Sequence, residues 1–256
     1  MSSQRLSKAI PAALVALALA GCGGSEPGSD GNTVTETGDL LPLAVGNVWE
    51  YRVTATDTTV TKKRTTVLDR EVVDGMGPYA ALMAFKVVTR KGPDLESETD
   101  LDKTESWQAP ASECTSCPTD VPRDPERILR YRELSYGAMT HLLQLEEFWD
   151  PPRIHIDGTA AHTASGALWI ETYMETKLPT GAAAIPAAKE QDLWQVASPD
   201  ETVTVPKGTF EHCVHFTKTA GSVKDYWYKR GVGKIKETGD NQTEELVNYT
   251  LEGPTP

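Results

Sequence analysis

The chain has 256 residues and a formal net charge of −12. This excess of acidic residues argues against nucleic acid as a partner, and against binding of anionic lipid through a basic patch. Beyond the N-terminus, no apolar run approaches the ~18–20 residues of a membrane-spanning helix, so a membrane contact must have another basis.

The N-terminus supplies that basis. Arg5 and Lys8 precede an apolar stretch that ends in small residues, which is typical of a secretory signal peptide over residues 1–21. The run Leu19-Ala20-Gly21-Cys22 resembles the lipobox of bacterial lipoproteins. That resemblance implies cleavage before Cys22, acylation of its thiol and amine, for example by palmitate, and retention on a membrane. Two or more acyl chains hold a protein stably, whereas one does so only marginally.

The residues after Cys22 indicate where the protein resides. The signal peptide contains two basic and no acidic residues, so the mature chain carries 23 basic and 37 acidic residues, net −14. Residues 22–39 are rich in Gly, Ser, Thr and acids and read as the lipidated cysteine with a flexible tether. Because Gly23 stands where inner-membrane lipoproteins commonly have Asp, we expect an extracytoplasmic protein in the cell envelope, in the outer membrane if the source is Gram-negative.

Residues 40–252 are dominated by strand patterns. Trp49, Tyr51 and Val53 alternate with polar residues, which is the period of two of a half-buried strand. Further strands are expected at Thr65–Val73, Ala84–Arg90, Lys103–Gln108, Arg127–Tyr136, Leu142–Trp149, Leu168–Glu175, Asp192–Val196, Thr202–Val205, Phe210–Lys218, Val223–Tyr228, Lys234–Thr238 and Glu244–Leu251. The segment Leu142–Trp149 also fits a helix. Residues 109–126 and 178–190 read as loops rich in Pro, Ala and Gly.

Roughly a dozen short strands with few helices predict a mainly β fold. We expect a curved antiparallel sheet, in the form of a half-barrel or open barrel. Such sheets usually keep one face in water, which agrees with the alternation along these strands.

Three segments resemble a family of known proteins: PLxxGNxWxY at Pro42–Tyr51, VPxGTFxxC at Val205–Cys213 and YWYxxGVGxxK at Tyr226–Lys236. In this order they resemble secreted bacterial proteins of unknown function, often lipoproteins and abundant in myxobacteria. The resemblance spans about residues 40 to 250. It implies a fold similar to the half-barrels of lipoprotein carriers, in which a curved sheet cups a hydrophobic groove; fold alone does not determine function.

The aromatic residues in these motifs have a structural interpretation of their own. We expect Trp49 in the core. Tyr226 and Tyr228 point to the opposite side of their strand from Trp227. At least one face at Tyr226, Trp227 and Tyr228 should therefore be covered or should form the wall of a ligand groove.

Three cysteines remain after Cys22. Cys114 and Cys117 lie in a Pro-rich loop outside the reducing cytoplasm, which favours a disulfide between them. The alternatives are a pairing of Cys213 with either one, a redox site, or zinc, since Cys114-x-x-Cys117 has knuckle spacing and Cys213 shares a strand face with His215. We predict neither a metal site nor a cofactor. Five alternating acids, Asp94 to Asp102, read as a solvated edge rather than a calcium site.

No signature of nucleophilic catalysis is present, so no catalytic residue is predicted. The leading hypothesis is a non-enzymatic, lipid-anchored envelope protein that binds an apolar small molecule or an envelope protein. The alternatives are a structural or assembly module without a ligand and an unrecognised hydrolase. A groove lined by aromatics would favour the first, a filled core the second, and convergent polar groups with perturbed acidities the third.

Overall fold

The computed structural model describes residues 38–96 and 101–252, so the predicted signal peptide and Cys22 lie outside the described residues. Almost all regular structure in these ranges is β. The strands are β1 (Val48–Ala55), β2 (Val60–Val72), β3 (Met83–Gly92), β4 (Asp102–Pro110), β5 (Arg127–Tyr136), β6 (Leu143–Asp157), β7 (Leu168–Pro179), β8 (Ile185–Val205), β9 (Gly208–Ala220), β10 (Ser222–Lys229), β11 (Gly233–Gly239) and β12 (Gln242–Thr250). The helices are α1 (Ala160–Thr163) and one 3-10 turn, Ala111–Glu113.

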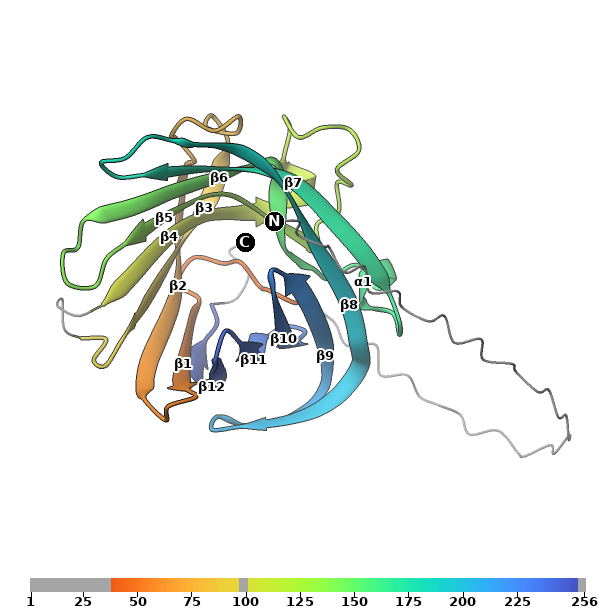
Figure 1. Cartoon of the computed structure of the whole chain (residues 1–256). Coiled ribbons are helices and arrows are strands. Elements are labelled where there is room, and N and C mark those ends of the chain that lie inside the picture. The colour runs from red at the N-terminus through yellow and green to blue at the C-terminus, as the bar shows by residue number, and fades with distance from the viewer. Residues whose placement is uncertain (1–37, 97–100, 253–256) are drawn as a thin grey trace, which may run out of the picture. The chain divides into compact units, whose positions relative to one another are not determined.

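The twelve strands form one closed antiparallel barrel in which each strand pairs with its neighbours in sequence (Figure 1). This confirms the mainly β, antiparallel fold with about a dozen strands and few helices. Closure is the feature that the sequence did not indicate: β1 pairs with β12, from Val48 opposite Thr250 to Ala55 opposite Gln242. This pairing removes the two free edges that an open sheet would leave.

Two local features of the sequence explain the backbone conformation at the two ends of β11. Asp240 and Asn241 both have positive φ, 48° and 60°, as a two-residue hairpin turn between β11 and β12 requires. At Gly233, where φ is 110°, a Cβ atom would lie 2.8 Å from Nε1 of Trp49. Glycine is therefore needed there both for the backbone conformation and for the close approach of the Trp49 ring.

The β8 strand differs from the prediction. The sequence indicated a loop over 178–190 followed by two short strands, but β8 runs unbroken from Ile185 to Val205. Its pairing with β9 shifts register three times between Val196 and Val203. Such bulges let one long strand bend, and they interrupt the alternation that marks a continuous strand in a sequence. Leu142–Trp149, for which a helix was the alternative, lies almost entirely in strand β6.

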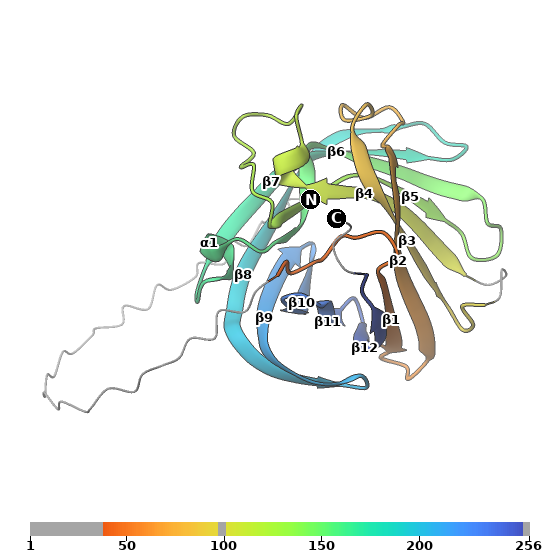
Figure 2. The same cartoon turned by 180° about the vertical axis from the view of Figure 1, so that it is seen from behind.

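The segment that precedes β1 runs across the barrel. Both views show it passing between the β9–β10 side and β1 (Figures 1 and 2). Leu40 is fully buried in a cluster with Phe216 and Trp194. The backbone N–H of Gly231 donates to the Asp39 carbonyl at 2.9 Å. This segment therefore packs into the end of the barrel where the chain enters β1. None of the helices in the described ranges is long and apolar enough to cross a bilayer.

Candidate functional site

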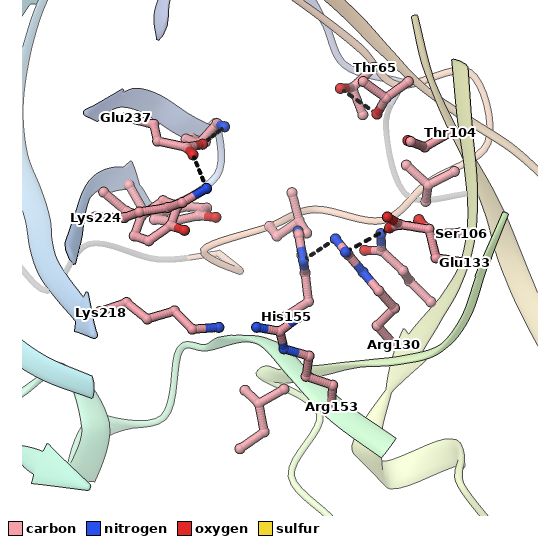
Figure 3. Close-up of a pocket in the computed structure, with 18 of the residues that line it drawn as sticks. Thr65, Thr104, Ser106, Arg130, Glu133, Arg153, His155, Lys218, Lys224 and Glu237 are labelled. Carbon is pink, nitrogen blue, oxygen red and sulfur yellow. Dashed lines mark hydrogen bonds and ion pairs between the residues drawn. The ribbon is translucent and has the colours of Figure 1, made fainter. Parts of the chain in front are cut away.

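The barrel encloses a cavity of about 490 Å³ (Figure 3). This lies in the range of about 300–1,000 Å³ that is usual for small-molecule sites. In an antiparallel meander the connections alternate between the two ends of the barrel. Leu41 and Leu43 line the cavity at the end that the segment before β1 crosses. The exposed residues Ser222 and Asp240 line it near the opposite end, where the cavity meets solvent.

One side of the cavity is aromatic. Trp194 on β8 and Tyr226 and Tyr228 on β10 line it, and their ring centroids are 5.9 Å apart for Trp194–Tyr226 and 6.5 Å apart for Tyr226–Tyr228. We call these three residues the aromatic wall. They meet in the cavity because Trp194, Tyr226 and Tyr228 are at inward positions of their strands. The aromatic wall offers an apolar surface to a ligand.

Beside the aromatic wall, two cations share one carboxylate. Arg153 on β6 and Lys218 on β9 lie 2.9 and 2.6 Å from Oδ2 of Asp192. Figure 3 shows the Arg153 and Lys218 side chains pointing toward each other. Burial raises the pKa of Asp192, but the charges of Lys218 and Arg153 outweigh it and lower the pKa below its usual value, so Asp192 is ionised. We call Arg153 and Lys218 the cation pair.

Burial changes the acidity of the groups around the cation pair. Burial and the neighbouring charge of Arg153 together lower the pKa of Lys218 to about 8, although Asp192 acts in the opposite direction. Glu171 on β7 accepts hydrogen bonds from the backbone N–H of Ile154 and from Nε1 of Trp194. Burial raises the pKa of Glu171 to about 7, so this carboxyl is only partly ionised near neutral pH.

The β4–β5 side of the cavity carries a smaller polar cluster. Arg130 donates to Oε2 of Glu133 at 2.7 Å and through Nη2 to Nδ1 of His155 at 2.7 Å. Burial, with the charge of Arg130, holds the pKa of His155 well below its usual value. His155 is therefore neutral, and because Nδ1 accepts from a guanidinium, its proton is on Nε2.

On the other side of the barrel, the lysines are matched by acids. Lys63 and Lys234 each lie 2.8 Å from Oε2 of Glu244, which is 2% exposed. Lys234 also pairs with Glu237. Burial raises the pKa of Glu244, but the charges of Lys234 and Lys63 lower it well below its usual value. This cluster is thus ionised and internally paired.

The charges that line or directly back the cavity, counted over the described residues, nearly cancel. The cations are Lys63, Arg130, Arg153, Lys218, Lys224 and Lys234, and the anions are Glu133, Asp192, Glu237, Asp240 and Glu244, with Glu171 partly ionised. Lys224 pairs with Asp240, Arg130 pairs with Glu133, and Lys63 and Lys234 are balanced by Glu237 and Glu244. Arg153 and Lys218 share the single charge of Asp192, so the excess positive charge is at the cation pair. An anion entering the cavity is therefore favoured at that position.

The predicted groove residues are divided between two faces of β10. Tyr226 and Tyr228 line the cavity, whereas Trp227 points away from it and stacks on His215, with ring centroids 4.2 Å apart. Trp49, which we predicted to be in the core, is 2% exposed, and its Nε1 donates to the Val232 carbonyl.

The cysteine-rich loop lies away from the cavity. Cys114 and Cys117 form a disulfide, and both are buried in a cluster with Tyr79, Trp107 and Leu129. Cys213 is buried on β9, and its thiol lies 3.6 Å from the carbonyl oxygen of Phe210. In the part of the chain that the structure describes, no group of three or more His, Cys, Asp or Glu side chains is arranged to hold a metal ion.

The sequence reasoning missed Arg153, Glu171, Asp192 and Lys218. A signal was present for two of these four residues, because their charges continue the inward phase of a strand. Asp192 precedes Trp194 and Val196, and Lys218 follows Val214 and Phe216, each at a spacing of two. A charged residue in phase with buried aromatics points into the barrel.

The fold and the cavity together define a twelve-stranded antiparallel barrel with a small-molecule-sized, partly charged interior. No protein-family model matches the chain, and no curated protein matches its sequence. Two solved structures align with it. One is from Bacteroides fragilis and is described as an exported protein with a YmcC-like fold; it has 11% identity and a TM-score of 0.44 over 84% of this chain and 100% of that chain. The other, from Parabacteroides distasonis, is described as a lipoprotein; it has 11% identity and a TM-score of 0.39 over the same shares of the two chains.

Proposed function

We propose that this chain is a lipid-anchored protein of the cell envelope whose barrel binds a small amphipathic anion. The envelope location is supported by the signal-peptide pattern and the lipobox-like run that ends at Cys22. The observation that carries the ligand class is the cation pair, in which Arg153 and Lys218 share Asp192 beside the aromatic wall. The sequence suggested an apolar ligand, and the charged part of the cavity refines this to an apolar body with an acidic head.

The geometry supports such a ligand in two ways. The ammonium group of Lys218 lies 4.5 Å from the centroid of the Trp194 ring, so the positive charge and the aromatic wall are in contact. An acidic head at the cation pair would thus place its apolar body against Trp194, Tyr226 and Tyr228. Hydrogen bonds to charged groups contribute about 1.5–3 kcal/mol, which is enough to orient a ligand of this size.

A hydrolase fits the cavity less well, although Glu171, Lys218 and His155 have perturbed pKa values of the kind that acid–base sites show. Activation of a hydroxyl or thiol nucleophile needs a base within hydrogen-bond reach of that group. Within the described residues, the hydrogen-bond partner of His155 is Arg130. The oxygens of Glu171 are engaged by Ile154 and Trp194. These groups are arranged for binding.

Fluorescence titration with a matched pair of probes tests the proposal. The probes are 8-anilino-1-naphthalenesulfonate and N-phenyl-1-naphthylamine, which share one aromatic skeleton and differ in the sulfonate. The protein is the full chain with Cys22→Ser, which blocks acylation. We expect Arg153→Met to weaken the sulfonate probe about tenfold, because the excess charge is lost, and to leave the uncharged probe nearly unchanged.

Asp192→Asn should act in the opposite direction and strengthen binding of the sulfonate probe, because it increases the excess positive charge. Arg52→Met is the matched control, since Arg52 pairs with Glu245 and its side chain is 48% exposed outside the cavity. Equal effects of Arg153→Met on both probes, or none on either, would contradict anion binding at the cation pair.

A further inference from the structure

Three polar groups on the β4–β6 side of the cavity lack partners in the described part of the chain. Oε1 of Gln108 and Nε of Arg130 are buried without a hydrogen bond. Nε2 of His155 carries the ring proton, and the hydrogen bond of this side chain is made by its other nitrogen, Nδ1. All three residues line the cavity. Buried polar groups nearly always find a partner, so Gln108 Oε1 and Arg130 Nε call for one. The Nε2–H of His155 is a further donor on the cavity lining.

The three groups form a row that leads to the cation pair. Gln108 on β4 lies opposite Arg130 on β5, and Arg130 lies opposite Arg153 on β6. Neighbouring strands are about 5 Å apart, so the backbones at Gln108 and Arg153 are about 10 Å apart. Both residues line the cavity. We call Gln108, Arg130 and His155 the amide row.

We infer that the amide row recognises a secondary amide in the bound anion, which makes the ligand an N-acyl amino acid or an acylated peptide carboxylate. This inference rests on the proposed function, because the carboxylate of such a ligand is held by the cation pair. The amide row would add a second polar contact, a few ångströms from the bound carboxylate.

The donors and acceptors of the amide row are complementary to an amide. His155 Nε2–H is a donor for a carbonyl oxygen, and Gln108 Oε1 is an acceptor for an N–H. Arg130 holds the His155 ring in place through Nδ1. The Gln108 amide now donates to Oγ of Ser106 at 2.8 Å. A half-turn about its last torsion, which is soft, exchanges Oε1 and Nε2 and places Oε1 beside Ser106, which also lines the cavity. An ester or an alkyl chain would leave at least one of these groups without a partner.

Isothermal titration calorimetry on the full chain with Cys22→Ser separates these ligands. N-dodecanoylglycine, O-dodecanoylglycolate and pentadecanoate have chains of equal length and differ in having an amide, an ester or methylenes at one place. We expect the amide to bind about tenfold more tightly than pentadecanoate, with the ester between them, since each neutral hydrogen bond contributes a few-fold to tenfold.

Two variants assign the effect to the amide row. Gln108→Met should reduce the affinity for the amide to that for the ester, and His155→Phe should reduce both to that for pentadecanoate. Gln195→Met is the matched control, because Gln195 is exposed on β8. Because the two variants lie on different strands, failure of one to fold leaves the other as the test.

The outcomes distinguish the two proposals. Equal affinities of wild type for the three ligands would overturn the amide row and leave anion binding intact. An amide preference that persists in both variants would also overturn it. No binding of pentadecanoate, or binding that Arg153→Met does not weaken, would instead contradict the proposed function.

Discussion

Lys218 packs against an aromatic ring of the barrel wall and is also one of the two charges of the cation pair. Its ammonium group lies over the Trp194 ring and 2.6 Å from Asp192, and its side chain is 9% exposed. Removing one member of a buried charge pair costs about 3–5 kcal/mol, because the other charge is left uncompensated. Lys218 and Arg153 share the single carboxylate of Asp192, and the proposed anion site rests on this arrangement.

The pH dependence of anion binding follows from Glu171 and Lys218. Glu171 gains negative charge as the pH rises through about 7, and Lys218 loses positive charge as it rises through about 8. Both changes oppose an anion, so the affinity for 8-anilino-1-naphthalenesulfonate should fall steadily from pH 6 to pH 9. Glu171→Gln should remove the step near pH 7 and keep the one near pH 8. A pH profile that is the same in wild type and Glu171→Gln would show that Glu171 is not the titrating group.

Trp49 and Trp227 should differ in their contributions to stability. Trp49 is 2% exposed and its indole N–H is satisfied by Val232, so Trp49→Ala should lower the free energy of unfolding by about 3–5 kcal/mol. Trp227→Ala should cost less, because Trp227 is only half-buried outside the cavity. Urea unfolding of both variants measures the difference. If Trp49→Ala left the free energy of unfolding nearly unchanged, Trp49 would not be a core residue.

At the scale of elements, the barrel combines strands that form its wall with irregular segments that fill one end. The segment before β1 buries Leu40 and brings Leu41 and Leu43 to the cavity. Asn47, which is fully buried, links this segment to the chain end: its amide donates to the Pro42 carbonyl, and its oxygen accepts from the N–H of Glu252. The base of the cavity is thus built by residues from the N-terminal end of the domain.

The long connection between β4 and β5 is held by the Cys114–Cys117 disulfide. A disulfide that closes so short a loop contributes about 2 kcal/mol in the chain-entropy model. We expect the double variant Cys114→Ser/Cys117→Ser to unfold at lower urea concentration and to be insensitive to reductant, unlike wild type. Mass mapping without reduction should find the 114–117 link. A link from Cys213 to either cysteine would contradict this assignment.

At the scale of the whole molecule, the proposed lipid anchor and the closed barrel would have separate roles, one in location and the other in binding. The described strands form the cavity, and the lipobox-like run that ends at Cys22 is where we propose the attachment. Each of these roles can therefore be removed alone.

Lipidation at Cys22 should account for membrane attachment. Cys22→Ala should release the protein from the membrane fraction or leave it unprocessed, because the acylated thiol is lost. The checks are fractionation of the source cells and metabolic labelling with palmitate. Retention and labelling equal to those of the unchanged chain would place the anchor elsewhere.

The sequence alone predicted most of the strands and the burial of Trp49. These follow from local rules: alternation with a period of two marks a strand, and residues such as Asp240 and Asn241 accept positive φ. It also contains the signal-peptide and lipobox patterns, which are contiguous. β8 was split in two because its bulges break the alternation on which the prediction depends.

The closure of the barrel and the cation pair were decided only by the tertiary structure. Lys63 and Glu244 are 181 residues apart in sequence, and Arg153 and Asp192 are 39 apart, yet each pair is in direct contact. Such contacts depend on the register between strands and on the pairing of β1 with β12. Register is set by the packing of the whole barrel, so a single strand's sequence cannot reveal which charge it will meet.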